Sequence, residues 1–242
     1  MFAKGLSSFQ LKCIAIITML IDHIATVVLV SMYMPFVVDN VIDLTGLPNS
    51  VVIAFYLRQP FNIIGRMAFP IFCFLLVQGF IHTKNIKKYI GRLLAFALIS
   101  EIPHDLALYN TVIEFSLQNV MVTLLIGILT LCLLKRIEDK YKNNILLIIG
   151  AILIGTVISI VTKCEYSKVA VLVISLMYLF REFRLLQIIG GSLPLVTTTW
   201  WVLPAFLPIA MYNGEQGIKM KYFFYWFYPV HLLILWLIVA VI

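Results

Sequence analysis

The chain has 242 residues, of which 62% are hydrophobic and only 12% are charged, and its formal net charge is +7. A soluble domain carries about 25% charged residues, so this composition excludes an ordinary soluble protein. It predicts an all-α, polytopic membrane protein, with residues 1–242 forming a single helical bundle in contact with the lipid bilayer.

Three clusters of basic residues divide the apolar runs. In membrane proteins such clusters mark cytoplasmic loops, and this rule accounts for the positive net charge without a nucleic-acid partner. We therefore expect a multi-pass protein of the cell (inner or cytoplasmic) membrane. The clusters are Lys84, Lys87, Lys88 and Arg92; Lys135, Arg136, Lys140 and Lys142; and Arg181 with Arg184.

The first apolar run, residues 11–31, resembles a secretory signal because a lysine stands at its start. It contains Asp22 and His23, however, and no small-residue cleavage site follows it, so we expect it to stay as a membrane anchor. From a cytoplasmic start it crosses outward, and residues 32–60 form a long outer loop. Further spans are predicted at residues 62–81, 89–108, 117–134, 145–161 and 169–180.

Residues 185–212 contain three prolines and a pair of glycines, which either bend one helix or divide two short ones. One span places Lys219 and Lys221 outside the cell, whereas two place them inside. A last span is predicted at residues 222–242. The count is therefore eight or nine helices, and the side of the C-terminus stays open.

Four ionisable residues are predicted to lie deep in the membrane. At a rise of about 1.5 Å per residue, His23, Glu101 and His231 each lie about 14–16 Å from a basic residue that marks a membrane edge. Asp105 follows one turn after Glu101 on the same helix face. A charge at the bilayer centre costs about 2.5–3.5 kcal/mol on insertion scales, so such groups are functional candidates. We predict that the four side chains meet in one pocket.

Other polar positions each have a structural and a functional interpretation. Arg66 lies about 24 Å from the cytoplasmic end by the same rise, where it either anchors in the headgroups or contacts substrate. Asn119 either caps a helix or lines an outward-facing mouth. The aromatic cluster that contains Tyr225 and Tyr228 is either an interfacial belt or part of the site.

Short motifs along nearly the whole chain resemble the TraX family, named for an inner-membrane enzyme that acetylates the amino terminus of F-type conjugative pilin. That family is distantly similar to the membrane acyltransferases that modify sugars. The motifs are LK at 11–12, IDH at 21–23, GRMAFPIF at 65–72, QGF at 78–80, SEIPHD at 100–105, QN at 118–119, YNG at 212–214, FY at 224–225 and FYPVHL at 227–232.

The resemblance implies acetyl-CoA as the donor and an amine or hydroxyl acceptor, on a pilin-like peptide, a glycan or another cell-surface component. Such an acceptor must lose a proton, and an α-amino group with a pKa of about 8 is mostly protonated at neutral pH. We expect His23 to be the base. Glu101 or Asp105 is expected to orient it, because Asp22 points about 100° away around the helix. Whether transfer is direct or passes through an acetyl-histidine stays open.

This interpretation gives two groups of site residues and no metal. The arginine and some of the polar groups would stabilise the oxyanion of the transition state. The expected catalytic residues are His23, Glu101, Asp105 and Arg66, and the expected substrate-binding residues are Asp22, Asn119, Tyr225, Tyr228 and His231.

Two other functions fit the same sequence. Membrane-embedded histidines and carboxylates also build proton-coupled secondary transporters, although no matching pair of broken helices is visible in the two halves of the chain. A non-catalytic factor for the assembly of surface structures is the other alternative.

Overall fold

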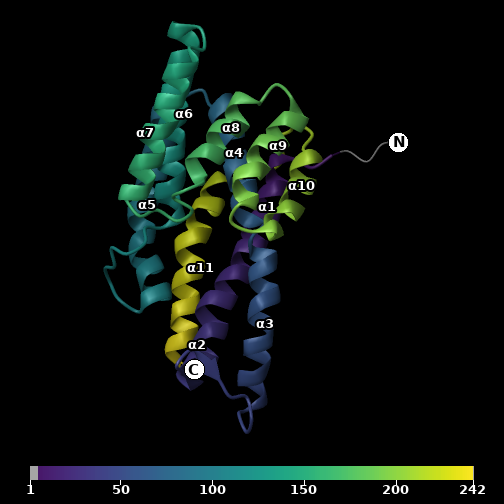
Figure 1. The fold of residues 1–242 in the computed structure, drawn as a ribbon, viewed down its shortest axis with the longest axis vertical. Coiled ribbons are helices and arrows are strands. Elements are labelled where there is room, and N and C mark those ends of the chain that lie inside the picture. The colour runs from purple at the N-terminus through teal and green to yellow at the C-terminus, as the bar shows by residue number, and fades with distance from the viewer. Residues whose placement is uncertain (1–4, 242) are drawn as a thin grey trace.

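The computed structural model describes residues 5–241, and Figure 1 shows an elongated bundle of helices. The first helix, α1 (Ser8–His23), begins with a capping box in which Ser7 and Gln10 pair with each other's backbone. It continues through the π-helical η1 (Ile24–Leu29), α2 (Val30–Tyr33) and the 3-10 turn η2 (Met34–Phe36). This run of 29 residues is about 43 Å long, more than the bilayer core of about 30 Å requires.

The long outer loop expected at residues 32–60 is wrong, because most of that segment is helical. Only residues 37–48 lie outside helices, and they include a hairpin of β1 (Val37–Val38) and β2 (Val41–Ile42). Its turn residues Asp39 and Asn40 both have positive φ, as a tight two-residue hairpin requires. From position 49 the chain is helical again, and Figure 1 shows this stretch returning alongside the first helix.

The returning stretch consists of α3 (Asn49–Gly65) and α4 (Ala68–His82), separated by a short break at residues 66–67. Pro60 lies inside α3. A proline with polar neighbours usually ends a helix, which is why the sequence placed the start of this span too late.

Four more helices follow in short succession: α5 (Ile86–Tyr109), α6 (Val120–Tyr141), α7 (Ile145–Val161) and α8 (Ala170–Leu179). Asparagine side chains accept hydrogen bonds from the first backbone amides of α5, α6 and α7, as favourable N-caps do. In Figure 1, α6 and α7 extend together beyond the other helices at the top of the view. The ten residues of α8 span only about 15 Å, too short to cross a bilayer alone.

Residues 184–212 form two short arms instead of one bent helix. These are α9 (Arg184–Val196) and a return arm made of η3 (Trp200–Ala205) and α10 (Phe206–Ala210). The Arg184 guanidinium lies 5.3 Å from the ring centre of Tyr212, so both ends of the segment meet. The chain then enters α11 (Lys221–Val241), and Figure 1 shows this helix running down to the C-terminus.

Basic residues gather at one end of the bundle. A hollow that contains Lys12 and Lys219 borders a cavity that contains Lys12 and Arg92, and this cavity shares Thr83 with a third hollow that includes Lys84. We call this the basic end. Lys219 therefore lies at the same end as the predicted cytoplasmic clusters, in agreement with two arms at residues 185–212.

The structure confirms a mostly helical protein with helices suited to a membrane. Among residues 5–241, four helical runs are long and apolar enough to cross one, and α5 is not among them. The expected total of eight or nine spans is not confirmed. The four runs are Ser8–Phe36, Asn49–His82, Val120–Tyr141 and Tyr222–Val241, and the shorter apolar helices are Ile145–Val161, Ala170–Leu179, Arg184–Val196 and Trp200–Ala210.

Candidate active site

Two predicted site histidines meet where α1 packs against α11. His23 Nδ1 lies 2.6 Å from His231 Nε2, and the two rings are stacked with their centres 4.9 Å apart. His231 Nδ1 lies 2.6 Å from the Phe227 carbonyl, to which it can only donate. In neutral imidazoles His231 Nε2 is then an acceptor, so His23 donates from Nδ1. His23 Nε2 then carries a lone pair that accepts no hydrogen bond from the described residues.

The backbone changes geometry directly after His23. The α-helix becomes a π-helix over Ile24–Leu29, and Thr26 donates its hydroxyl proton to the Asp22 carbonyl at 2.7 Å. π-helical turns are rare and are frequent at functional sites, because they shift side chains from their α-helical positions. Here the shift begins at the predicted base.

His23 lines a small cleft inside the bundle, with a volume of about 30 Å³. That is room for about one water molecule. Its walls come from α1, α3, α4, α6, α11 and the loop between α7 and α8. They are formed by Met19, Asp22, His23, Gly65, Ala68, Phe69, Phe72, Val120, Glu165, Tyr166 and Tyr228.

Asp22 is held against the end of α3. Its Oδ1 accepts a hydrogen bond of 3.0 Å from the Asn62 side chain. Gly65 lies so close that an added Cβ would overlap the Asp22 carboxyl group. The glycine at this position therefore makes room for the carboxylate, which reaches the cleft although it does not face His23 along the helix.

The loop at residues 162–169 supplies two cleft residues that the sequence analysis missed. Tyr166 stacks on Phe69 with ring centres 3.9 Å apart and accepts a hydrogen bond of 3.4 Å from Arg66. Burial, and after it the nearby Asp22, raise the pKa of Glu165 to about 7, although Arg66 opposes both effects. A carboxyl group with this pKa exchanges protons near neutral pH.

Tyr228 and the start of α6 face each other across the cleft. The Tyr228 hydroxyl is buried and has no well-aligned hydrogen-bond partner among the described residues, although the Val120 backbone lies close to it. Val120 is the first residue of α6, so its N–H has no partner within the helix and carries the positive end of the helix dipole. Such donors stabilise a developing oxyanion.

The predicted residues Glu101 and Asn119 are bonded to each other. The Asn119 amide donates to the Glu101 carboxylate and to the Ala97 carbonyl, the latter at 2.9 Å. Its Oδ1 accepts from the Met121 amide at 2.9 Å and so caps α6. Asn119 thus ties α5 to α6, and its amide is already occupied.

Asp105 has two partners of its own, neither of which is His23. Its Oδ1 lies 3.1 Å from His104 Nδ1, and its Oδ2 accepts a hydrogen bond of 2.8 Å from the Glu114 amide. It therefore fastens the loop that follows α5. Among residues 5–241, no hydrogen bond joins Glu101 or Asp105 to His23. The structure brings His23 and His231 together but places the two α5 carboxylates on other partners.

The same α5 cluster is where a metal ion would find ligands. Glu101, His104 and Asp105 each offer one ligand atom, and these atoms lie within 4.8 Å of one another. His104 Nε2 and Glu101 Oε1 are buried without a hydrogen-bond partner among the described residues. A nitrogen and two carboxylates suit a transition metal such as zinc or iron.

Two larger hollows border the cleft on opposite sides. A cavity of about 310 Å³, which we call the inner cavity, shares the Phe72 side chain with the cleft and opens toward the basic end. The predicted residue Tyr225 lines this inner cavity, stacked on Phe96, and not the cleft. A hollow of about 390 Å³ contains Arg66 and shares Tyr166 with the cleft. We call it the Arg66 hollow.

Comparison with known proteins gives one family match, and its residue range includes every residue that lines the cleft. A family model described as TraX protein matches residues 7–239. The chain is similar to a probable fimbrial assembly protein FimC, serogroup H1, of Dichelobacter nodosus. The two are 28% identical over 252 residues, which cover 95% of this chain and 94% of the relative. No solved structure matches.

Proposed function

Because the chain belongs to the TraX family, as its motifs predicted, we propose that it is a membrane-embedded acetyltransferase that uses acetyl-CoA. The acceptor is an amine or hydroxyl group on a pilin-like peptide or another cell-surface component. The relative named as a fimbrial assembly protein supports an acceptor of this kind.

The observation that carries the proposal is the lone pair of His23 Nε2, on a histidine that lines a small cleft. His231 and the Phe227 carbonyl fix the proton of His23 on Nδ1. Nε2 is therefore available to take a proton from an acceptor, as a general base requires. The cleft has room for only about one water molecule, which limits competition between water and the acceptor.

The reaction exchanges one bond at the acetyl carbonyl carbon. The acceptor nitrogen or oxygen attacks this carbon while His23 Nε2 takes the acceptor proton. The carbon–sulfur bond then breaks, and the imidazolium returns the proton to the leaving thiolate, so that free CoA and the acetylated acceptor result. The Tyr228 hydroxyl and the Val120 amide support the oxyanion between these steps.

In this proposal the substrates reach the cleft from opposite sides. The thioester arrives through the inner cavity, past Phe72, and the acceptor arrives through the Arg66 hollow, past Tyr166. The basic end then faces the cytoplasm, where acetyl-CoA is made, as the positive-inside rule also favours.

Thiol labelling tests this orientation. In a background without the four native cysteines, cysteine at Lys87 or Lys140 should resist an impermeant thiol reagent added outside intact cells. Cysteine at Asp43, in the loop at the opposite end, should react. Labelling of the cysteines at positions 87 and 140 from outside would show that the protein has the opposite orientation.

Transfer of labelled acetyl groups tests the activity. Protein in nanodiscs, given radiolabelled acetyl-CoA and separated lipid, glycan and protein acceptors, should label one fraction. His23→Gln should lower the rate per folded molecule by about 100-fold to 10,000-fold, the usual contribution of a positioned base. Thr18→Val is the matched control, because Thr18 is buried in the same helix and bonds only to carbonyls of that helix. An unchanged rate in His23→Gln would refute the mechanism.

A second candidate follows from the name of the relative. A factor that assists fimbrial assembly without catalysis is compatible with membership in this family. It predicts that no fraction becomes labelled, and that His23→Gln affects assembly only as far as it lowers protein abundance.

A further inference from the structure

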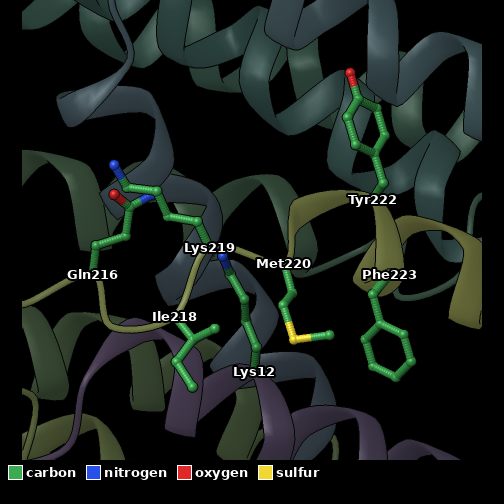
Figure 2. A pocket seen from close by; sticks show the side chains of 7 residues that line it. All are labelled: Lys12, Gln216, Ile218, Lys219, Met220, Tyr222 and Phe223. Atoms are coloured by element: carbon green, nitrogen blue, oxygen red, sulfur yellow. The ribbon is translucent and has the colours of Figure 1, made fainter.

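The basic end contains a second hollow, of about 580 Å³, which the proposed reaction does not yet use. Figure 2 shows it between the start of α1, the loop before α11 and the first turn of α11. Lys12 enters from α1, while Gln216, Lys219 and Met220 belong to the loop. We call this space the basic hollow. It is lined by Lys12, Gln216, Ile218, Lys219, Met220, Tyr222 and Phe223.

The basic hollow and the inner cavity are continuous in their walls and share one sign of charge. Both are lined by Lys12 and Gln216. Lys219 adds a cation to the first and Arg92 adds one to the second. Among the residues that the structure describes, no aspartate or glutamate lines either space. Arg92 Nε is buried without a hydrogen-bond partner among the described residues. Cationic walls without acidic neighbours favour a ligand with several negative charges.

The apolar parts of the two spaces differ in kind. Ile218, Met220 and Phe223 give the basic hollow apolar side chains beside its lysines, which suits a purine ring next to phosphates. The inner cavity is lined mainly by leucines and aromatic rings and ends at Phe72, which it shares with the cleft. Away from Lys12 and Arg92, this apolar lining suits an uncharged arm.

The distance between the two ends fits one ligand class. Lys12 and His23 lie on α1 eleven positions apart, or about 16 Å at the rise of a helix. This is comparable to the extended pantetheine arm that separates the thiol of CoA from its phosphates. A free nucleotide would fill the basic hollow but leave the inner cavity empty.

We propose that the basic hollow binds the 3′-phosphorylated adenosine diphosphate of CoA, with Lys12 and Lys219 on its phosphates, while the inner cavity holds the pantetheine arm. The proposal rests on the acetyltransferase function given above and adds the site that selects the donor. Lys12 lines the basic hollow, and its amine also lies 5.5 Å from the centre of the Phe224 ring.

Two donors that differ only in the nucleotide test the assignment. For acetyl-CoA, Lys12→Gln and Lys219→Gln should each raise KM by about 10-fold, the loss expected for a charged hydrogen bond. For acetyl-pantetheine, which has no phosphate, the same variants should leave KM unchanged. Lys168→Gln is the matched control, because Lys168 is an exposed lysine in the loop after α7, away from both spaces. Thermal unfolding of each variant shows whether it has folded.

Direct binding separates this proposal from the activity. Titration of CoA and of adenosine 3′,5′-bisphosphate into protein in nanodiscs should give binding that Lys12→Gln and Lys219→Gln weaken and Lys168→Gln does not. Such binding without any acetyl transfer would keep the site and refute the enzyme. Acetyl transfer with equal KM for wild type and both variants would keep the enzyme and overturn the site. Lys12→Arg should retain CoA binding, and its loss in a folded variant would also overturn the site.

Discussion

Two polar clusters in the bundle, each with a histidine proposed or available as a proton acceptor, use their hydrogen bonds differently. In the α1–α11 pair, each ring proton has a defined acceptor, and the one lone pair left over belongs to His23, which lines the cleft. In the α5–α6 cluster, Asp105 bonds to His104 and to a loop amide, and Glu101 bonds to Asn119. His104 Nε2 has no hydrogen-bond partner among the described residues, but His104 is not one of the residues that line the cleft. Residue type and predicted depth therefore suggest several candidate bases. The candidate is identified only by an unoccupied lone pair and by its position beside the cleft.

The strongest test of this contrast is the partner of the proposed base. His231→Phe keeps a ring stacked between Phe227 and His23 but removes the acceptor for His23 Nδ1–H. Turnover should fall on the order of 100-fold to 10,000-fold, because the imidazole loses its productive tautomer. Steady-state kinetics per folded molecule measure this. Wild-type kcat in a well-folded His231→Phe protein would show that the pair does not set the tautomer.

The opposite behaviour is expected for Asp105. Asp105→Ala leaves the His104 ring and the Glu114 amide without their acceptor, at a cost of about 1–3 kcal/mol for each unpaired group. Thermal unfolding should detect the loss, and the loop at residues 110–119 should become more sensitive to protease. Activity per folded molecule should stay unchanged. Asp43→Ala, at an exposed carboxylate, is the control. A stable Asp105→Ala protein without activity would contradict the assignment of the base to α1 and favour a base on α5.

A smaller difference in stability is expected between glycine substitutions in the cleft wall and in α7. Gly65→Ala puts a methyl group into the Asp22 carboxyl, and the repacking should cost about 1–3 kcal/mol. Gly150→Ala, in α7, meets nothing within 4 Å and should be neutral or stabilising by up to about 1 kcal/mol. Unfolding midpoints of the two variants give the comparison. Equal midpoints would mean that Asp22 is free to leave the cleft wall.

Much of the fold and part of the site could be predicted from the sequence because they depend on local pattern. Apolar runs and basic clusters located most helices. Counting residues along each helix predicted similar levels for His23 and His231, and the structure brings these two side chains together. The partners of Asp105 could not be predicted in this way. They depend on how the loop after α5 folds back to present the Glu114 amide, which no helical spacing describes.

Glu165 was missed because it lies beyond an apolar run, between Lys163 and Lys168, where a solvated loop is the ordinary expectation. One signal could have found it. The predicted span at residues 169–180 covers only about 18 Å, which is too short to cross a bilayer. The loop before so short a helix must start within the bundle, and an acidic residue there needs a polar cleft.

The central claim is that His23 carries its proton on Nδ1 and presents an unprotonated Nε2 to the cleft. Nitrogen-15 NMR of the histidine-labelled protein in nanodiscs tests this directly, with the four histidines assigned by single His→Gln substitutions. The account predicts that His23 Nε2 shows the signal of an unprotonated ring nitrogen, and that His231→Phe removes this preference. A proton on Nε2 of His23 in the wild-type protein would contradict it, because the cleft would then face a donor and not a base.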